Sequence, residues 1–329
     1  MKLRAYRACV ALLVLACHAR GQGRPSALER DCEAGSQQAC CDLSATTASD
    51  PRERKEAVAC VGPAVLARLA ERDSDEDVRI SAVDRLEDQA LLAKLAMRDK
   101  SWDVRNHAIV RLSDQRLLAK VATQNSDWIH RVTAVEMLTD QKVLAEIARG
   151  AGERNEDVRA AAIEKLEDQA VLARIATRDR KETMRWHAAV RLKDQALIAQ
   201  IVQKDESDLV RGWTMQKLTD PALLTVIVRT HPESSRRQVA ARKLTDPALF
   251  AELVANDPSA EVRWIAAERI TDPAVLAKVA RTDSDWRVRR EATQKLTDEA
   301  LLREISKTDP QAAVRFIAEK RLKELPQKR

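Results

Sequence analysis

The chain has 329 residues and a formal net charge of +6, and 33% of its residues are charged while 3% are aromatic. Its seven glycines form no phosphate-binding loop, and its five histidines are dispersed along the sequence. The composition therefore predicts a solvated, non-catalytic protein that needs no cofactor and holds no metal.

The N-terminus has the features of an export signal over residues 1–16. A basic start precedes an apolar stretch over residues 8–16 that is too short to remain as a membrane anchor. The segment VLAC at 14–17 resembles a bacterial lipobox, which implies lipidation of Cys17 and membrane association through that lipid. The alternative is ordinary cleavage after Ala19 or Gly21. Either way we expect an exported protein of the bacterial cell envelope.

The charge of the mature protein is small. The signal contains three basic residues, so a chain that starts at Cys17 has 54 basic and 51 acidic side chains, a net charge of +3. An exported protein with so small a basic excess is not expected to bind nucleic acid.

A linker over residues 17–30 leads to a cysteine-rich segment at 31–60. Its cysteines are Cys32, Cys40, Cys41 and Cys60, and an even number in an exported protein predicts two disulfides. A zinc site is the alternative, but Cys40 and Cys41 are adjacent and no histidine lies nearby. The segment 31–40 is similar to the cysteine-bridged helical repeats of secreted bacterial proteins, relatives of tetratricopeptide repeats. That resemblance implies that Cys32 and Cys40 join adjacent helices. We expect this segment to cover the apolar end of a repeat array.

The remainder of the sequence repeats itself with a period of about 26 residues. The phrase Leu-x-Asp-(Gln/Pro)-Ala-Leu-Leu-Ala returns at this interval, with one interval of 28 that contains Gly150 and Gly152. A fixed period in this range is typical of stacked supersecondary units. Extending the register predicts ten units over residues 61–324 and a short tail at 325–329. The aspartates of the phrase are Asp88, Asp114, Asp140, Asp168, Asp194, Asp220, Asp246, Asp272 and Asp298.

Each unit is expected to contain two short helices, A and B. At the start of helix A, Asp220 is a natural N-cap, and Pro221 fits the first helical position, where no amide hydrogen is needed. Helix B begins at a second polar cap and in one copy places Val78, Ala82 and Leu86 on a single face. One helix pair cannot bury that face alone, whereas stacked pairs share a core. The predicted fold is therefore all-α, an α-solenoid.

Helix B also carries a family resemblance. The motif (Asp/Glu)-Val-Arg-x-x-Ala-x-x-x-Leu, which begins at Asp103, Asp157 and Glu261, resembles the second helix of HEAT and HEAT-like repeats. The period is short for HEAT repeats and closer to short bacterial HEAT-like or leucine-rich-variant repeats. The resemblance implies a binding scaffold. Because some bacterial relatives are bilin lyases, a HEAT-like lyase is the less favoured alternative.

One arginine recurs in the first turn of every helix B and points toward the core. A cation is unfavourable at this end of a helix, so each guanidinium must be paired. Aspartates six residues earlier, such as Asp73 before Arg79, are the expected partners, which predicts a structural ladder; an anion-binding track is the alternative. The ladder arginines are Arg79, Arg105, Arg131, Arg159, Arg185, Arg211, Arg237, Arg263, Arg289 and Arg315.

A second basic line follows six residues later, at the end of helix B, and is expected to face away from the core. Such cations complement the helix dipole, or they form a ridge that binds an anionic partner. Members of this ridge proposed for a partner surface are Arg191, Lys217, Lys243 and Arg269.

Tryptophans lie along one flank of helix B and are either half-buried between repeats or anchors for a partner. Those proposed for the partner surface are Trp102, Trp128, Trp186, Trp264 and Trp286, and Trp213 lies one position off this flank. The favoured function is a scaffold that binds a protein partner through one long face. The alternative is the binding of an anionic envelope glycan or lipid through the basic ridge.

Overall fold

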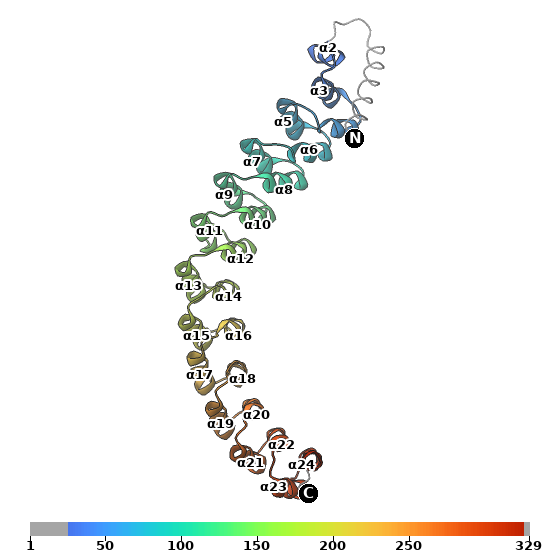
Figure 1. The fold of residues 1–329 in the computed structure, drawn as a ribbon. Coiled ribbons are helices and arrows are strands. Elements are labelled where there is room, and N and C mark those ends of the chain that lie inside the picture. The colour runs from blue at the N-terminus through green and yellow to red at the C-terminus, as the bar shows by residue number, and fades with distance from the viewer. Residues whose placement is uncertain (1–25, 326–329) are drawn as a thin grey trace. The chain divides into compact units, whose positions relative to one another are not determined.

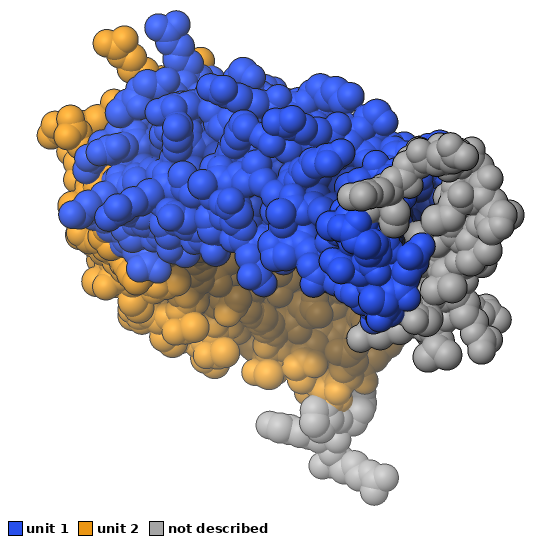
Figure 2. Space-filling model, turned by 90° about the horizontal axis from the view of Figure 1, so that it is seen from above, with its two compact units in different colours: residues 1–168 blue, residues 169–329 orange. Residues whose placement is uncertain are grey.

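A computed structural model describes residues 26–325. The predicted signal peptide and Cys17 lie outside these residues. Within them the protein forms 23 helices and no strand. The helices divide into two compact units, residues 1–168 and 169–329, which are described separately (Figures 1 and 2).

Ten helix pairs follow the predicted period, which confirms the all-α repeat fold. In unit 1, helix A is α5 (Pro63–Arg72), α7 (Gln89–Arg98), α9 (Gln115–Gln124) and α11 (Gln141–Ala148), and helix B is α6 (Glu76–Val83), α8 (Trp102–Arg111), α10 (Trp128–Met137) and α12 (Glu156–Lys165). In unit 2, helix A is α13 (Gln169–Arg178), α15 (Gln195–Lys204), α17 (Pro221–Thr230), α19 (Pro247–Asn256), α21 (Pro273–Thr282) and α23 (Glu299–Thr308). Helix B of unit 2 is α14 (Glu182–Ala189), α16 (Asp208–Lys217), α18 (Ser234–Lys243), α20 (Ala260–Arg269), α22 (Trp286–Lys295) and α24 (Ala312–Glu324).

The repeated aspartate begins helix A as its N-cap. The Asp88 carboxylate accepts hydrogen bonds from the amides of Ala90 and Leu91 at 2.9 and 3.0 Å, so the first turn of α7 has satisfied donors. Ser101 caps α8 in the same way. Ser259, at the start of α20, makes no capping bond, because its hydroxyl bonds the Glu261 side chain instead.

The two helices of each pair bury apolar side chains against each other and against the next pair. In the second repeat, Leu92 and Leu95 of α7 and Val104 and Ala108 of α8 are buried. Successive B helices α6, α8 and α10 contact one another, as do α7 and α9. The core is therefore continuous along each unit, because every repeat shares its apolar face with its neighbours.

The N-terminal segment contains three helices, α2 (Ala27–Glu33), α3 (Gln37–Thr47) and α4 (Pro51–Ala57). Two disulfides are present, as predicted. Cys32 and Cys40 join α2 to α3, which is the pairing that the resemblance to cysteine-bridged repeats implied. Cys41 of α3 is bonded to Cys60, which follows α4. Disulfides persist in oxidising compartments, so they indicate an exported environment.

The last two of these helices form an additional repeat that the sequence analysis missed. Helix α3 contacts α5 and α4 contacts α6, as helices A and B of adjacent repeats do. Arg54 of α4 bonds the Asp73 carboxylate at 2.8 Å and the Ala48 carbonyl at 3.1 Å, which are the contacts of a ladder arginine. The repeat architecture therefore begins before the expected boundary at residue 61. Over residues 26–325, no helix has both the length and the apolar character needed to cross a membrane.

Candidate binding surface on helix B

The recurring arginine joins successive repeats. Arg79 donates from Nη1 to the backbone carbonyl of Asp73, six residues earlier, at 2.8 Å. Its Nε and Nη2 bind the carboxylate of Asp99, twenty residues later, at 3.1 and 3.2 Å. The predicted partner was the side chain of Asp73, which is wrong, because the Asp73 carboxylate is already bound by Arg54 of the preceding repeat. A ladder aspartate such as Asp73 or Asp99 thus offers its carbonyl to the arginine of its own repeat and its carboxylate to the arginine of the previous repeat.

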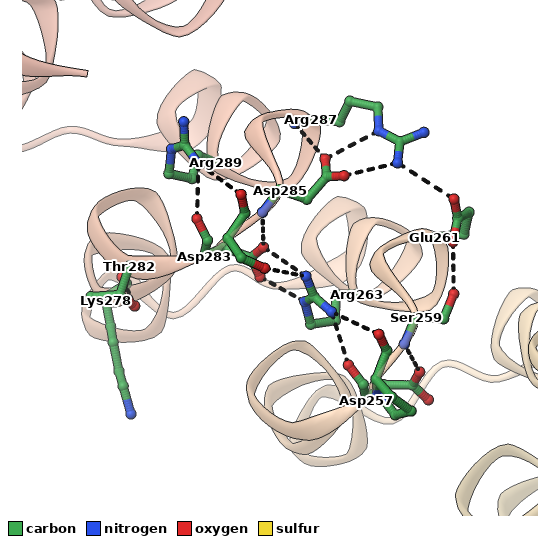
Figure 3. Close-up of polar contacts among 12 residues, drawn as sticks. Asp257, Ser259, Glu261, Arg263, Lys278, Thr282, Asp283, Asp285, Arg287 and Arg289 are labelled. Carbon is green, nitrogen blue, oxygen red and sulfur yellow. Dashed lines mark hydrogen bonds and ion pairs between the residues drawn. The ribbon is translucent and has the colours of Figure 1, made fainter. Parts of the chain in front are cut away.

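The same bidentate geometry recurs in unit 2, and Figure 3 shows it around Arg263 and Asp283. Burial opposes ionisation of Asp309, but hydrogen bonds from Arg289 and from the Gln311 amide outweigh it and lower the Asp309 pKa. Because these guanidinium groups bind carboxylates, the bonding favours a structural role over an anion-binding track. The bidentate pairs of unit 2 are Arg185 with Asp205, Arg237 with Asp257, Arg263 with Asp283 and Arg289 with Asp309.

The remaining ladder arginines vary in their second partner. Where the repeat is two residues longer, Arg131 binds the Glu153 carboxylate at 2.7 and 3.1 Å. Arg159 donates from Nε and Nη2 to the carbonyl of Ala148. Arg315, in the last helix, donates to the carbonyls of Asp309 and Pro310.

Two loops have neither an aspartate nor a glutamate at this position. In one of them Asn125 donates to the carbonyl of Ala96 at 2.9 Å, and in the other the ring of His231 bonds the carbonyl of Val202 at 3.2 Å. Both side chains are 4% exposed. Arg211, which precedes the His231 loop, binds Glu233 at 2.9 Å instead. The predicted pair of Arg211 with the Asp205 side chain is therefore wrong, because that carboxylate belongs to Arg185.

Part of the basic ridge is not a free surface, contrary to expectation. The ammonium of Lys243 donates to three carbonyls at the end of the preceding helix B, those of Met215, Gln216 and Leu218, at 2.7–3.0 Å. Burial lowers the Lys243 pKa. Lys295 binds the end of α20 in the same way. These cations therefore satisfy C-terminal carbonyls of the adjacent repeat. Arg191, Lys217 and Arg269, by contrast, are exposed.

The predicted tryptophans divide into exposed and packed side chains. Trp102 and Trp128 are 40% and 42% exposed. Trp186 is half-buried and packs against Trp213, with ring centroids 6.0 Å apart. Two others are half-buried beneath arginines: Arg242 lies over Trp264 and Arg290 over Trp286, at 5.9 and 5.8 Å from the ring centroids. These are cation–π distances.

Exposed apolar side chains concentrate on helix B. Of nine large ones among the described residues, eight lie on helix B, and Val226 alone lies on helix A. Most of them were not predicted from the sequence, although the i, i+4 spacing of Leu209 and Trp213 places both on one face of a helix. The eight are Trp102, Val110, Trp128, Ile129, Met137, Leu209, Trp213 and Phe316.

The helix B rows of the two units differ in charge. The row of unit 1 (α6, α8, α10 and α12) carries six basic and seven acidic residues, whereas the row of unit 2 (α14, α16, α18, α20, α22 and α24) carries 17 basic and seven acidic residues. Without the ladder arginines the counts are two and seven in unit 1, and 11 and seven in unit 2. The exposed tryptophans therefore lie in an acidic setting in unit 1 and in a basic one in unit 2.

The described residues gather no metal-binding cluster. They contain no group of three or more His, Cys, Asp or Glu side chains placed to hold a metal ion. The hollows between repeats are shallow; one of about 390 Å³ is lined by the ladder residues Arg263 and Asp283, which bind each other. Helix B, with its exposed apolar side chains, is the feature best suited to binding.

A comparison with solved structures supports the repeat fold. A leucine-rich repeat variant with a novel repetitive protein structural motif matches with a TM-score of 0.50 and 27% identity, covering 66% of this protein and 86% of that one. An engineered protein matches with a TM-score of 0.23, 17% identity and coverage of 97% and 94%. A designed armadillo repeat protein in complex with the peptide (KR)4 matches with a TM-score of 0.11, 16% identity and coverage of 87% and 98%.

The last two superpositions are too poor to carry an argument, and none of the three supports the resemblance to cysteine-bridged repeats. No protein-family model and no curated protein matches the sequence. The protein is thus similar to a solved leucine-rich repeat variant, in agreement with the short period of its repeats.

Proposed function

We propose that this protein is a non-catalytic scaffold of the bacterial cell envelope that binds another protein through helix B. The observation that carries the proposal is the placement of eight of the nine exposed large apolar side chains on helix B. Exposed apolar side chains that gather on one kind of element are typical of interaction surfaces, and tryptophans are frequent anchors in them. The two disulfides support export, and lipidation of Cys17 would hold the protein at a membrane.

The sharpest test removes the most exposed apolar pair of one helix. Leu209 and Trp213 of α16 are 44% and 56% exposed, so replacing both by serine leaves the core unchanged. Crosslinking in detergent-solubilised envelopes should recover a partner with the wild type and roughly tenfold less with Leu209→Ser/Trp213→Ser, the scale of one lost anchor.

Val226→Ser on α17 is the matched control, because Val226 is 46% exposed on helix A and its loss should leave recovery unchanged. Equal recovery with the double variant and the wild type would contradict a helix B interface.

An anionic glycan or lipid is the second candidate, and the basic excess of the unit 2 row favours it. Binding through many cations weakens steeply as salt screens them, whereas an interface anchored by aromatic side chains does not. Lys217→Glu is the informative substitution, since Lys217 is exposed. A large loss of salt dependence in that variant would support the glycan or lipid, and an unchanged salt dependence would support the protein partner.

The lipid anchor has its own test. Cys17→Ser should abolish acyl labelling and membrane fractionation while the repeats remain folded. Recovery of soluble wild-type protein that begins at Arg20 or later would contradict lipidation.

A further inference from the structure

Arg105 differs from the other ladder arginines in what faces its side chain. Its Nη1 donates to the carbonyls of Asp99 and Lys100 at 2.7 and 3.4 Å, the contacts that Arg79 makes in the preceding repeat. In every other repeat whose next neighbour lies in the same unit, the guanidinium also binds a carboxylate of that neighbour. Among residues 26–325, no carboxylate lies within 4.0 Å of the Arg105 guanidinium.

Asn125 is the cause of this difference, because it occupies the position of the ladder aspartate. Its Oδ1 accepts from the Asp127 amide at 2.9 Å, as the ladder aspartates do with the amide two residues later. Its Nδ2 donates to the Ala96 carbonyl at 2.9 Å. The Asn125 amide nitrogen is a donor where an aspartate has its second acceptor oxygen, so Asn125 preserves the loop but cannot form the charged bidentate contact that Asp99 makes with Arg79.

The comparison with Arg211 shows that the loss is not compensated. There, His231 replaces the aspartate and Glu233, two residues later, binds the arginine. The residue equivalent to Glu233 in the Asn125 loop is Asp127. Its carboxylate instead caps α10 and accepts from the indole of Trp102 at 3.1 Å.

We propose that Arg105 binds a carboxylate of a protein partner, which takes the place of the aspartate or glutamate that binds the equivalent arginine in other repeats. Two backbone carbonyls hold the guanidinium in place, so it can form two parallel hydrogen bonds with little further ordering. The side chain is half-buried, which strengthens such bonds relative to bulk water.

An exposed apolar ring lies beside this cation, in a row of helices that is otherwise acidic. Trp102 lies one turn before Arg105 on α8, is 40% exposed, and stacks on His130 with ring centroids 4.9 Å apart. His130 is fully buried, and that burial lowers its pKa, so it is neutral at pH 7. The carboxylate of a Glu or Asp side chain, or that of a polypeptide terminus, would meet one fixed cation beside an apolar ring. The inference rests on the proposed function only in that a protein supplies this carboxylate.

The test uses small probes of defined chemistry. N-acetylglycine carries a terminal α-carboxylate, and N-acetylglutamic acid α-amide carries the carboxylate of a glutamate side chain. N-acetylglycinamide is the neutral control. Binding is followed by NMR from the guanidinium N–H signals of Arg105 and the indole signal of Trp102, at constant ionic strength. We expect at least one carboxylate probe to bind the wild type and the neutral probe not to bind; the stronger probe identifies the source of the carboxylate.

The decisive variant is Asn125→Asp, which restores the ladder aspartate and should occupy Arg105 from within. It should weaken carboxylate binding at least roughly tenfold, since the guanidinium then makes its charged contact within the protein. Arg105→Lys retains the charge but not the planar fork, and should weaken binding as well. Equal affinity in the wild type and Asn125→Asp would overturn the inference.

Both variants are checked for intact helicity, and Asn125→Asp reproduces the residue found in most other repeats, so it should fold. This result and the helix B test are separable. Unchanged partner recovery in Leu209→Ser/Trp213→Ser contradicts the proposed interface without affecting carboxylate binding at Arg105. Equal probe binding in the wild type and Asn125→Asp removes only the Arg105 site.

Discussion

Helix A begins with glutamine in some repeats and with proline in others. The glutamine side chain bonds the next repeat, whereas proline cannot. Gln115 accepts hydrogen bonds from the Thr139 amide at 2.7 Å and from the Thr139 hydroxyl at 3.1 Å, both in the next repeat. Proline has no side-chain hydrogen-bonding group, so Pro221, Pro247 and Pro273 cannot make this contact. The glutamines are Gln89, Gln115, Gln141, Gln169 and Gln195.

The difference separates two contributions to the stability of a repeat array. Such stability is approximately the sum of intrinsic repeat terms and nearest-neighbour terms. Glutamine stabilises the contact between neighbouring repeats and so adds to the nearest-neighbour term. Proline restricts the unfolded polypeptide, which adds to the intrinsic stability of its own repeat. The glutamine repeats should therefore unfold together over longer stretches, while the proline repeats should be less coupled.

Acid should have the largest effect on the free energy of unfolding. It should act equally on the glutamine repeats and on the proline repeats. Burial opposes ionisation of Glu153 and Asp309, but hydrogen bonds from Arg131 and Arg289 lower both pKa values. A carboxylate with a lowered pKa stabilises the fold above its unfolded pKa of about 4, and this contribution is lost as the pH falls through the folded pKa. Urea midpoints should thus fall steeply below about pH 5, where the carboxylates begin to protonate in the unfolded state. A midpoint that rises with acid would contradict the ladder.

The next largest effect should come from one ladder arginine. Arg79, which binds Asp99 of the first glutamine repeat, and Arg237, in a proline repeat, are 2% and 6% exposed. Replacing either by alanine strands a buried aspartate and should cost roughly 3 kcal/mol or more of unfolding free energy. Urea melts combined with amide hydrogen exchange measure the loss and its extent along the array.

Two controls sharpen this measurement. Asp257→Ala combined with Arg237→Ala should cost less than the sum of the single substitutions, because the pair is removed together. Arg105→Ala should cost markedly less than Arg79→Ala, since no carboxylate is stranded. Equal costs for Arg105→Ala and Arg79→Ala would show that the carbonyl contacts, not the ion pairs, carry the ladder.

Gln115→Ala tests directly whether the glutamine repeats are more strongly coupled to their neighbours than the proline repeats. Losing the acceptor of the Thr139 amide should cost about 1 kcal/mol and shorten the stretch that unfolds together. Gln115→Glu retains an acceptor oxygen and should lose less. Hydrogen exchange at the Thr139 amide reports the contact, and unchanged protection in Gln115→Ala would show that the glutamine does not couple the repeats.

The smallest effect on the free energy of unfolding should come from replacing the proline of a proline repeat. Pro247→Ala should cost about 0.4–1 kcal/mol, the entropic contribution of proline at a compatible position. Pro247→Gln loses the same entropy but gains a side chain able to bond the loop of the next repeat. It should therefore cost less than Pro247→Ala, and a larger cost would contradict the division between the two regions.

Much of the fold could be predicted because it depends on local signals. The Asp88 cap, the apolar spacing and the 26-residue period act within one repeat or identically in all of them. The additional repeat at α3 and α4 was hidden, because it lacks the repeated aspartate phrase. Its only signals were Arg54 and the cap Asp50 before Pro51.

The candidate site was less predictable, because its contacts join different repeats. Helical geometry places Arg79 toward the interior but does not say whether its carboxylate lies six residues before or twenty after. The same is true of Lys243, whose position at a helix end suggested exposure. The partner of Arg79 and the exposure of Lys243 both depend on how one repeat is positioned against the next.

By itself, the sequence determined the helices, their caps, their number in the periodic region and the residue types that must be paired, because these follow from interactions a few residues apart. Only the tertiary structure decided the partners. The carboxylate for each arginine, the carbonyls for Lys243, the exposure of Trp213 and, among the described residues, the absence of a carboxylate at Arg105 arise where repeats stack. The period alone does not distinguish between candidate partners in neighbouring repeats. Stacking decides which of them come into contact.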